Sequence, residues 1–243
     1  MELNGRVALV TGGAHRVGRA LSTALAHAGM RIAIDYHASD AEAKSLVSEL
    51  AAAGHECRAY QFDLTKPDSP SSLIAQVTSD FGGLDVLVNS AAVMQRTPVD
   101  EVTVQQWDAM FALNLRAPFF LSQAAHPWLS KAHGCIVNLS DLAAFETWPD
   151  YIPHSISKAG IVQMTRAMAR VFAPEVRVNA IAPGAVLLPD NWTDAARAHF
   201  EKTTPLQRIG SPQDVVDAML YLLRADYVSG DTLLVDGGRH VRG

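Results

Sequence analysis

The chain has 243 residues, of which 49% are hydrophobic and 19% charged, and its formal net charge is −5. This composition is typical of a soluble globular protein and excludes an intrinsically disordered one. Lysine and arginine are scattered, so no basic stripe indicates a nucleic acid or a membrane surface as partner. No signal peptide precedes the first predicted strand, and we expect a cytoplasmic protein without a membrane span. Cys57 and Cys135 fall in predicted strands, where we expect buried free thiols.

Short apolar segments alternate with helical patterns along the first half of the chain. In chain order we predict a strand over 7–10, a helix over 16–29, a strand over 32–34, a helix over 41–53, a strand over 57–62, a helix over 67–81 and a strand over 84–88. The first helix places Val17, Leu21 and Leu25 on one face, as the helical period requires. Gly54 is placed to end the second helix.

The second half repeats this plan. We predict a long helical region over 104–129, a strand over 135–139, a helix over 154–172, a strand over 176–181, a helix over 212–223 and a strand over 232–235. Such alternation predicts parallel βαβ units with helices on both faces of one sheet. The predicted fold is therefore α/β, a doubly wound Rossmann-type sheet in a single domain over 1–243. The long irregular stretch 184–205 is predicted to be a substrate lid.

A glycine-rich turn joins the first strand to the first helix. Gly12 and Gly18 allow the backbone to turn tightly and allow a pyrophosphate to approach the start of the helix. The free N–H groups and the dipole at that helix start favour negative charge. The strand–turn–helix context favours a nucleotide site over an ordinary tight turn.

From Thr11 onward the chain resembles the short-chain dehydrogenase/reductase family over about residues 5–240. The resemblance is carried by the Thr-Gly-x-x-x-x-x-Gly turn, by Asp63-Leu64, by Asn89-Ser90-Ala91-Ala92, by Asn114, by Pro183-Gly184 and by Val235-Asp236-Gly237-Gly238. It implies binding of a nicotinamide dinucleotide by Gly12, Val17, Gly18, Asp63, Leu64, Asn89, Ser90, Ala91, Lys158, Pro183, Gly184 and Val186. Family tetramers pair the helices that match 104–129 and 154–172, so a homotetramer is implied as well.

The choice between NAD and NADP depends on a few residues after the turn and the second strand. Asp35 is a candidate ligand for a ribose 2′-hydroxyl, which favours NAD, but the acid that selects NAD in the family aligns with Tyr36. Arg16, which stands where the family usually has glycine, and Ser39 are candidates to hold a 2′-phosphate, with help from His37. We favour NADP(H). Arg16 and the segment 36–39 also resemble the pteridine-reductase branch of the family.

The catalytic motif departs from the family pattern. The family uses Ser, Tyr and Lys, and here the lysine is Lys158, whereas His154 replaces the tyrosine. Asp141 replaces the serine, and pteridine reductases also carry Asp at that position. A histidine can still transfer a proton near neutral pH, so His154 is the predicted proton donor, with Asp141 orienting it and Lys158 holding the ribose. Asn114 matches the asparagine of the family's proton relay. Tyr151 is an alternative acid, and a site that no longer turns over is the alternative to both.

The substrate side carries less information. Met94, Trp148, Tyr151 and Trp192 are the candidate pocket residues, and the histidines show no metal-ligand spacing. The expected activity is NADPH-dependent reduction of a small carbonyl or imine compound, for which a pterin-like molecule is one candidate. Met94 stands where pteridine reductases stack the pterin on an aromatic ring, and this weakens that candidate. The alternatives are a non-catalytic protein that senses the cofactor or serves as a partner, and an enzyme with rerouted Asp–His acid–base chemistry.

Overall fold

One parallel sheet organises the computed structural model, which describes residues 1–187 and 193–241. The strands lie in the order β3-β2-β1-β4-β5-β6-β7. Their bounds are Val7–Val10 for β1, Arg31–Tyr36 for β2, Cys57–Gln61 for β3, Val86–Asn89 for β4, Cys135–Leu139 for β5, Arg177–Pro183 for β6 and Thr232–Val235 for β7. The order reverses between β1 and β4, which pair side by side. Open α/β sheets bind ligands at the carboxyl ends of the strands beside such a switch point.

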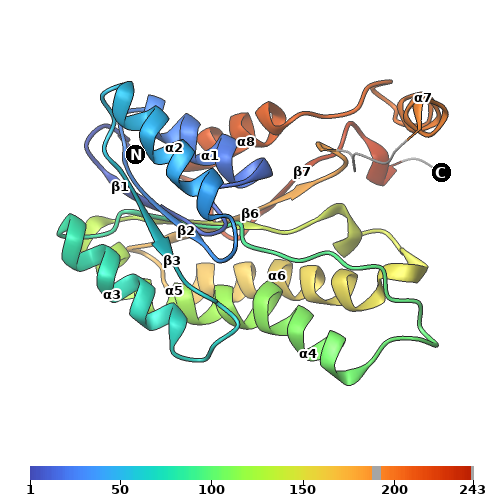
Figure 1. The fold of residues 1–243 in the computed structure, drawn as a ribbon, viewed down its shortest axis with the longest axis horizontal. Coiled ribbons are helices and arrows are strands. Elements are labelled where there is room, and N and C mark those ends of the chain that lie inside the picture. The colour runs from blue at the N-terminus through green and yellow to red at the C-terminus, as the bar shows by residue number, and fades with distance from the viewer. Residues whose placement is uncertain (188–192, 242–243) are drawn as a thin grey trace.

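Helices cover both faces of this sheet (Figure 1). One face carries α1 (Arg16–His27), α2 (Asp40–Ala52) and α8 (Pro212–Arg224), and the other carries α3 (Ser69–Phe81), α4 (Val104–Phe111), α5 (Ala117–Ala132) and α6 (Ile152–Val171). Two apolar cores form, one on each face. Because the central strands are covered on both sides, they are mostly apolar, and all of β1 and β5 is buried. The predicted single-domain Rossmann-type fold is confirmed.

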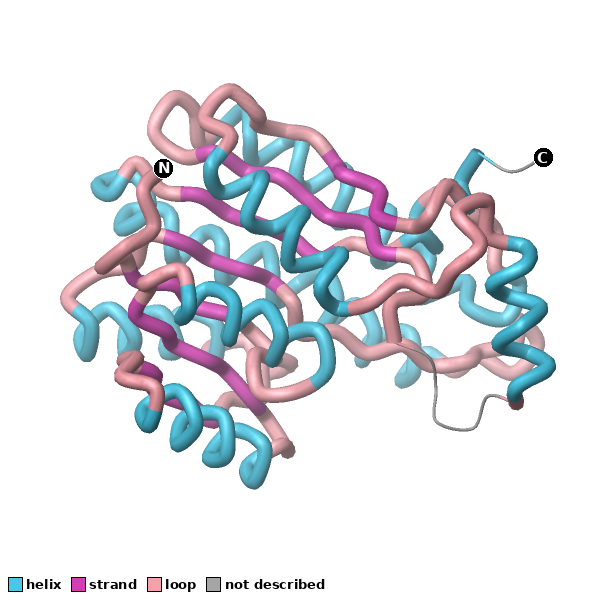
Figure 2. The backbone as a smooth tube through the Cα atoms, turned by 90° about the horizontal axis from the view of Figure 1, so that it is seen from above, coloured by secondary structure: helices cyan, strands magenta, loops and turns pink. Residues whose placement is uncertain are grey.

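Two predicted segments differ from the structure. The long helix predicted over 104–129 is three consecutive pieces, because a π-helix over Ala112–Arg116 separates α4 from α5. The stretch 184–205 was predicted to be irregular, and this is wrong for α7, which spans Asp194–Thr203. No residue of α7 is buried, and Phe200 is its one large apolar residue, so the sequence shows no broad apolar stripe that would reveal the helix. Figures 1 and 2 place α7 beyond the carboxyl ends of the strands.

The cysteines are buried free thiols, as predicted. Within residues 1–187 and 193–241, no helix is both long enough and apolar enough to cross a membrane. Trp192, a predicted pocket residue, lies outside the described residues.

Candidate active site

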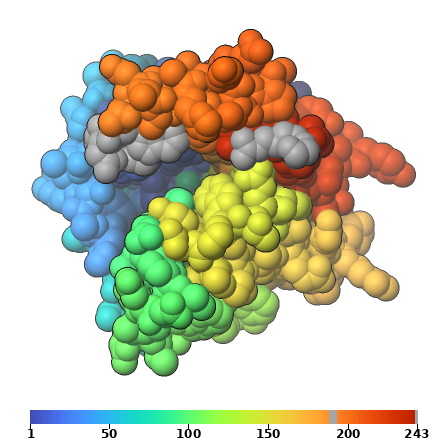
Figure 3. Space-filling view, turned by 90° about the vertical axis from the view of Figure 1, so that its right-hand side faces the viewer, coloured from blue at the N-terminus to red at the C-terminus, as the bar shows by residue number. Residues whose placement is uncertain are grey.

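A cavity of about 880 Å³ opens at the carboxyl ends of the strands. Its walls come from the β1–α1 turn, from the segments that follow β2 to β6, and from α7 and the C-terminal segment. Figure 3 shows the hollow between the orange surface of α7 and the green and yellow segments that follow β4 and β5. This volume lies at the upper end of the range for small-molecule and cofactor sites.

The glycine-rich turn forms one end of the cavity. Gly12 has φ +61°, and a Cβ atom on Gly18 would lie 2.1 Å from the Gly12 carbonyl oxygen, so neither position has room for a side chain without distortion. Arg16 also has a positive φ, of 50°, which is a backbone conformation that favours glycine. The side chain of His15, the N-cap residue, makes no capping hydrogen bond to a described residue. The first amides of α1 are therefore free to bind an anion.

Residues after β2 and β3 line the part of the cavity next to the turn. Asp35, His37 and Asp63 are among them. The Asp35 carboxyl group is buried and accepts a weak hydrogen bond, 3.5 Å long, from the Gly12 amide. Burial raises the pKa of Asp35 to about 7. Tyr36 and Ser39, which were predicted to bind the cofactor, are not among the described residues that line the cavity.

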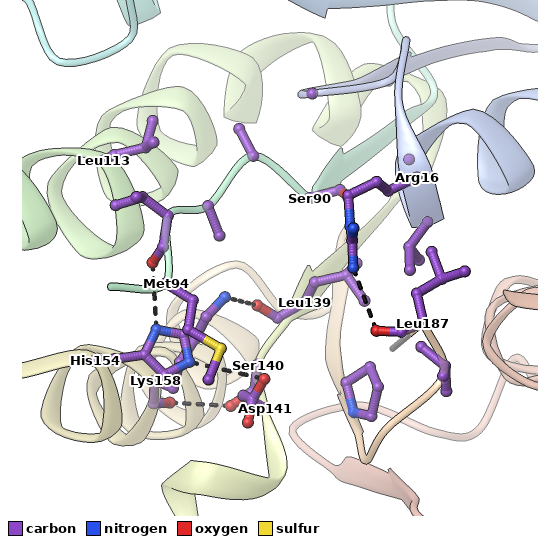
Figure 4. A pocket seen from close by; sticks show the side chains of 18 of the residues that line it. Arg16, Ser90, Met94, Leu113, Leu139, Ser140, Asp141, His154, Lys158 and Leu187 are labelled. Carbon is purple, nitrogen blue, oxygen red and sulfur yellow. Dashed lines mark hydrogen bonds and ion pairs between the residues drawn. The ribbon is translucent and has the colours of Figure 1, made fainter. Parts of the chain in front are cut away.

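The Arg16 side chain reaches across the cavity (Figure 4). Its guanidinium group donates a hydrogen bond of 3.2 Å to the Leu187 carbonyl, on the segment after β6. Pro183, Gly184 and Val186 of the same segment also line the cavity. The positively charged Arg16 guanidinium therefore lies near the start of α1, beside residues predicted to bind the cofactor.

Buried polar contacts hold the segment after β4 in place. The Thr11 hydroxyl accepts hydrogen bonds from the amides of Ser90 and Ala91, both of which line the cavity. Asn89 is not among the described residues that line the cavity. Its side-chain amide donates a hydrogen bond of 2.8 Å to Asn138 Oδ1. Asn89 therefore joins β4 to β5 and acts on the cavity through the backbone.

Asn114, predicted to anchor a proton relay, lies in the π-helix and is not among the described residues that line the cavity. Its side-chain amide accepts a hydrogen bond from the Val93 amide at 2.8 Å and donates to the Val93 carbonyl at 2.9 Å. It also donates to the Ser157 hydroxyl. Asn114 therefore positions Val93, whose carbonyl contacts His154.

His154 lies between Val93 and Asp141, at the far end of the cavity from the turn (Figure 4). Its Nδ1 atom is 3.2 Å from the Val93 carbonyl oxygen. A carbonyl only accepts hydrogen bonds, so this contact requires a proton on Nδ1. Nε2 lies 3.7 Å from Asp141 Oδ2 and is buried, with no hydrogen-bond partner among the described residues. Nε2 is therefore the atom left to exchange a proton.

Lys158 is one helical turn after His154 and is also buried in the cavity wall. Its ammonium group donates a hydrogen bond of 2.8 Å to the Leu139 carbonyl. Burial lowers the pKa of Lys158 to about 8, and the negative charge of Asp141 opposes this shift. The predicted group of Asp141, His154 and Lys158 is thus brought together in one wall.

The remaining predicted pocket residues lie around this group. Met94, Trp148 and Tyr151 line the cavity, and the rings of Trp148 and Tyr151 are 6.2 Å apart in an edge-to-face arrangement. Glu146 and Arg239, which the sequence did not predict as pocket residues, also line the cavity. Glu146 accepts a hydrogen bond from Trp148 Nε1, and its position between Asp141 and Trp148 was an available signal. Arg239 follows the Asp236-Gly237-Gly238 segment, but nothing in the sequence indicated its side chain.

Known proteins are similar to this chain along nearly its whole length. A family model described as enoyl-(acyl carrier protein) reductase matches residues 12–240. The 3β-hydroxysteroid dehydrogenase 1 of Eggerthella lenta is 33% identical over 246 residues, covering 98% of this chain and 94% of that protein. The 3-oxoacyl-(acyl-carrier-protein) reductase FabG of Staphylococcus aureus is 32% identical over 240 residues, covering 96% and 98%. A blue fluorescent protein from a metagenomic library, solved in complex with NADPH, superposes with a TM-score of 0.92 at 32% identity, covering 98% and 99%.

Proposed function

The chain belongs to the short-chain dehydrogenase/reductase family, and from this premise we propose that it is an NADPH-dependent reductase of a small carbonyl or imine compound. The observation that carries the proposal is one continuous cavity, with the glycine-rich turn at one end and Asp141, His154 and Lys158 at the other. The names of the relatives indicate acyl and steroid substrates for those proteins. The resemblance of Arg16 and Asp141 to pteridine reductases keeps a pterin-like imine among the candidates.

The residues of the cavity fit a nicotinamide dinucleotide. Gly12 and Gly18 leave the space that a Cβ atom would fill, beside the free amides of α1, and a pyrophosphate needs this close approach. Asp63, Leu64, Ser90 and Ala91 would hold the adenosine half. Lys158 would hold the nicotinamide ribose with the N–H donors that Leu139 does not use.

The preference for NADPH over NADH rests on charge. Arg16 places a cation over the turn, where it would pair with a 2′-phosphate. Asp35 is only 2% exposed and faces the Gly12 amide, so it is poorly placed to accept from a ribose hydroxyl. Its raised pKa also reduces the negative charge that a phosphate would meet.

The chemistry of the reaction divides between cofactor and protein. The cofactor, when bound, supplies a hydride to the substrate. His154 holds one proton on Nδ1 against Val93 and exchanges the other at Nε2. Asp141 Oδ2 lies 3.7 Å from Nε2 and would orient the ring. A positioned acid of this kind contributes about 10²–10⁴-fold to a rate.

A non-catalytic cofactor sensor is the second candidate function. It is favoured by one observation, that the Nε2 atom of His154 is shielded from solvent and makes no described hydrogen bond. In such a protein Asp141 and His154 would close the site without transferring a proton. A rerouted acid–base reaction without net hydride transfer would use the same pair.

We also propose that the protein is a homotetramer. Large apolar side chains on α4 and α5 are exposed in the single chain, namely Val104, Trp107, Phe119, Phe120 and Trp128. Exposed apolar groups that gather on neighbouring elements are typical of protein interfaces. A second copy of the chain is the partner that a symmetric oligomer requires.

Two measurements made together test the proposed function. NADPH binding is followed by the fluorescence of the cofactor, and NADPH consumption is followed with cyclic imines, ketones and pterins. We expect tight binding and turnover with at least one class of substrate. Binding without turnover on any class would favour the sensor, and no binding would overturn both functions.

A further inference from the structure

We infer that the substrate end of the cavity selects a nitrogen compound held as a cation, an iminium or ammonium group, over a neutral carbonyl compound. This inference rests on the proposed reductase function and names its substrate class. The side chains that carry it all come from the segment between β5 and the first turn of α6, and they are Asp141, Glu146, Trp148, Tyr151 and His154.

The pair of Asp141 and His154 presents hydrogen-bond acceptors when the histidine is neutral. The proton on Nδ1 is held by the Val93 carbonyl, so the Nε2 lone pair remains beside the Asp141 carboxylate, 3.7 Å from Oδ2. A ketone oxygen needs donors at this point, because negative charge develops on it during reduction. A protonated nitrogen carries the N–H donor and the positive charge that two adjacent acceptors match.

Burial of the unsatisfied acceptor points independently to a ligand at this site. The His154 side chain is 3% exposed, and Nε2 lacks a partner among the described residues. Buried polar atoms are nearly always hydrogen-bonded, and an exception indicates a group that is satisfied in another state of the protein. The Asp141 side chain is 25% exposed, so an incoming cation meets this carboxylate first and Nε2 next to it.

The surroundings of the pair also favour a cation. Trp148 Nε1 donates a hydrogen bond of 3.0 Å to Glu146, and this holds a second carboxylate in the cavity wall. The rings of Trp148 and Tyr151 are nearly perpendicular, at 78°. Both rings line the cavity, and aromatic rings attract cations.

The positive side chains at this end are engaged by the protein. Lys158 donates to the Leu139 carbonyl. The Arg239 guanidinium lies 3.8 Å from the centre of the Phe200 ring and donates to the Thr204 hydroxyl. The cations are thus bound at the walls, whereas the carboxylates of Asp141 and Glu146 lie on the segment that carries the proton donor.

The reaction balances for a neutral imine that enters the site. The protonated His154 gives its Nε2 proton to the imine nitrogen, which forms an iminium ion beside Asp141. The hydride then adds to the carbon atom, and the π electron pair of the C=N bond moves to nitrogen to give the amine. A ketone oxygen is too weakly basic to take this proton before the hydride arrives, so negative charge develops on it beside the Asp141 carboxylate during the transfer, and like charges repel.

Binding of a matched pair of probes tests the inference without turnover. The probes are 1,2,3,4-tetrahydroisoquinoline, which is a cation at neutral pH, and isochroman, its neutral oxygen analogue, each titrated by calorimetry into the protein saturated with NADPH, from which neither probe can accept a hydride. We expect the cation to bind on the order of tenfold more tightly or better, since a cation–π contact and one ion pair supply that much. Asp141→Asn keeps an oxygen to cap Ala143 and should remove most of the preference. The matched control is Asp108→Asn, on the exposed part of α4.

The outcomes separate this inference from the proposed function. Equal binding of the two probes, or tighter binding of isochroman, would overturn the inference. So would reduction of ketones with no reduction of imines, and in that case the reductase function would stand. Cation-selective binding that Asp141→Asn abolishes, with no NADPH consumption on any substrate, would instead uphold the cation site and overturn the reductase.

Discussion

The Nε2 atom of His154 lies 3.7 Å from Oδ2 of Asp141, while its Nδ1 atom lies 3.2 Å from the Val93 carbonyl. The two ring nitrogens therefore have different roles. Nδ1 keeps its proton because the carbonyl oxygen that it faces can only accept a hydrogen bond, and Nε2 is left for proton exchange. Asn114 stabilises this arrangement, because its side-chain amide is hydrogen-bonded to both the backbone N–H and the carbonyl of Val93.

The turn should not tolerate a side chain at Gly18. A Cβ atom there would lie 2.1 Å from the Gly12 carbonyl oxygen, so Gly18→Ala should destabilise the fold by about 1–3 kcal/mol and prevent cofactor binding. Thermal unfolding and NADPH titration measure the two effects. Gly83→Ala is the control, because no atom lies within 4 Å of a Cβ at that position. Normal NADPH affinity in the Gly18 variant would contradict the proposed pyrophosphate site.

Arg16 should separate the two nicotinamide cofactors. Arg16→Ala should weaken NADPH binding by about 1–3 kcal/mol, the scale of a charged hydrogen bond, and leave NADH nearly unchanged. Titration calorimetry with both cofactors measures this. Arg19→Ala is a matched control on the same helix, since Arg19 pairs with Glu49 outside the described cavity lining. Equal affinities of the unmodified protein for NADH and NADPH would point to Asp35 instead.

Much of this site follows from local sequence, and the rest depends on long-range packing. Gly12, Gly18 and the group of Asp141, His154 and Lys158 stand at fixed spacings beside predicted strands, so the order of elements brings them to one edge of the sheet. Asn89 and Asn114 are different, because Asn89 contacts Asn138 on the adjacent strand β5 and Asn114 contacts Ser157 on α6, both far away in the sequence.

The helix α7, the π-helix and the position of Arg239 were not predicted, and each has a physical reason. The helix α7 has no buried face, so periodicity does not reveal it, although Thr193 caps its first turn. The break between α4 and α5 is a π-helix in a continuous helical pattern, which a period of 3.6 residues does not show. Arg239 lines the cavity only because the C-terminal segment folds back against α7.

Lys158 should make the stability of the cofactor-free protein depend on pH. Its folded pKa of about 8 is below the ordinary value of 10.5, so the unfolded chain binds more protons between these two values. The free energy of unfolding should therefore rise with pH across this window, relative to Lys158→Met. At pH 7 the variant should be more stable by about 1–3 kcal/mol. Denaturant unfolding at both ends of the window measures this.

The control for that prediction is Lys131→Met, at the exposed end of α5, which should show no such difference. A Lys158 variant that is less stable than the unmodified protein at neutral pH would contradict the effect of burial. It would mean that the hydrogen bond to Leu139 outweighs the loss of hydration.

The proposed homotetramer should depend on the apolar residues of α5. Light scattering at micromolar concentration should give about four times the mass of the chain, which is 26.2 kDa. Phe119→Asp and Phe120→Asp should lower this mass, because a buried unpaired charge opposes association. Ala41→Asp, on the exposed first turn of α2, adds the same charge away from α4 and α5 and serves as the control. A monomer for the unmodified protein would contradict the proposal.

Proton transfer by His154 is the central claim, and one comparison tests it most directly. The rates of NADPH consumption are measured at neutral pH with 2,3,3-trimethyl-3H-indole, a weakly basic imine that is neutral there, and with its N-methyl iminium salt, which needs no proton. For His154→Gln we predict a loss of about 10²–10⁴-fold on the neutral imine, with the iminium salt reduced nearly as before and NADPH affinity retained. Equal losses on both substrates, or no loss on either, would contradict the role of His154 as proton donor.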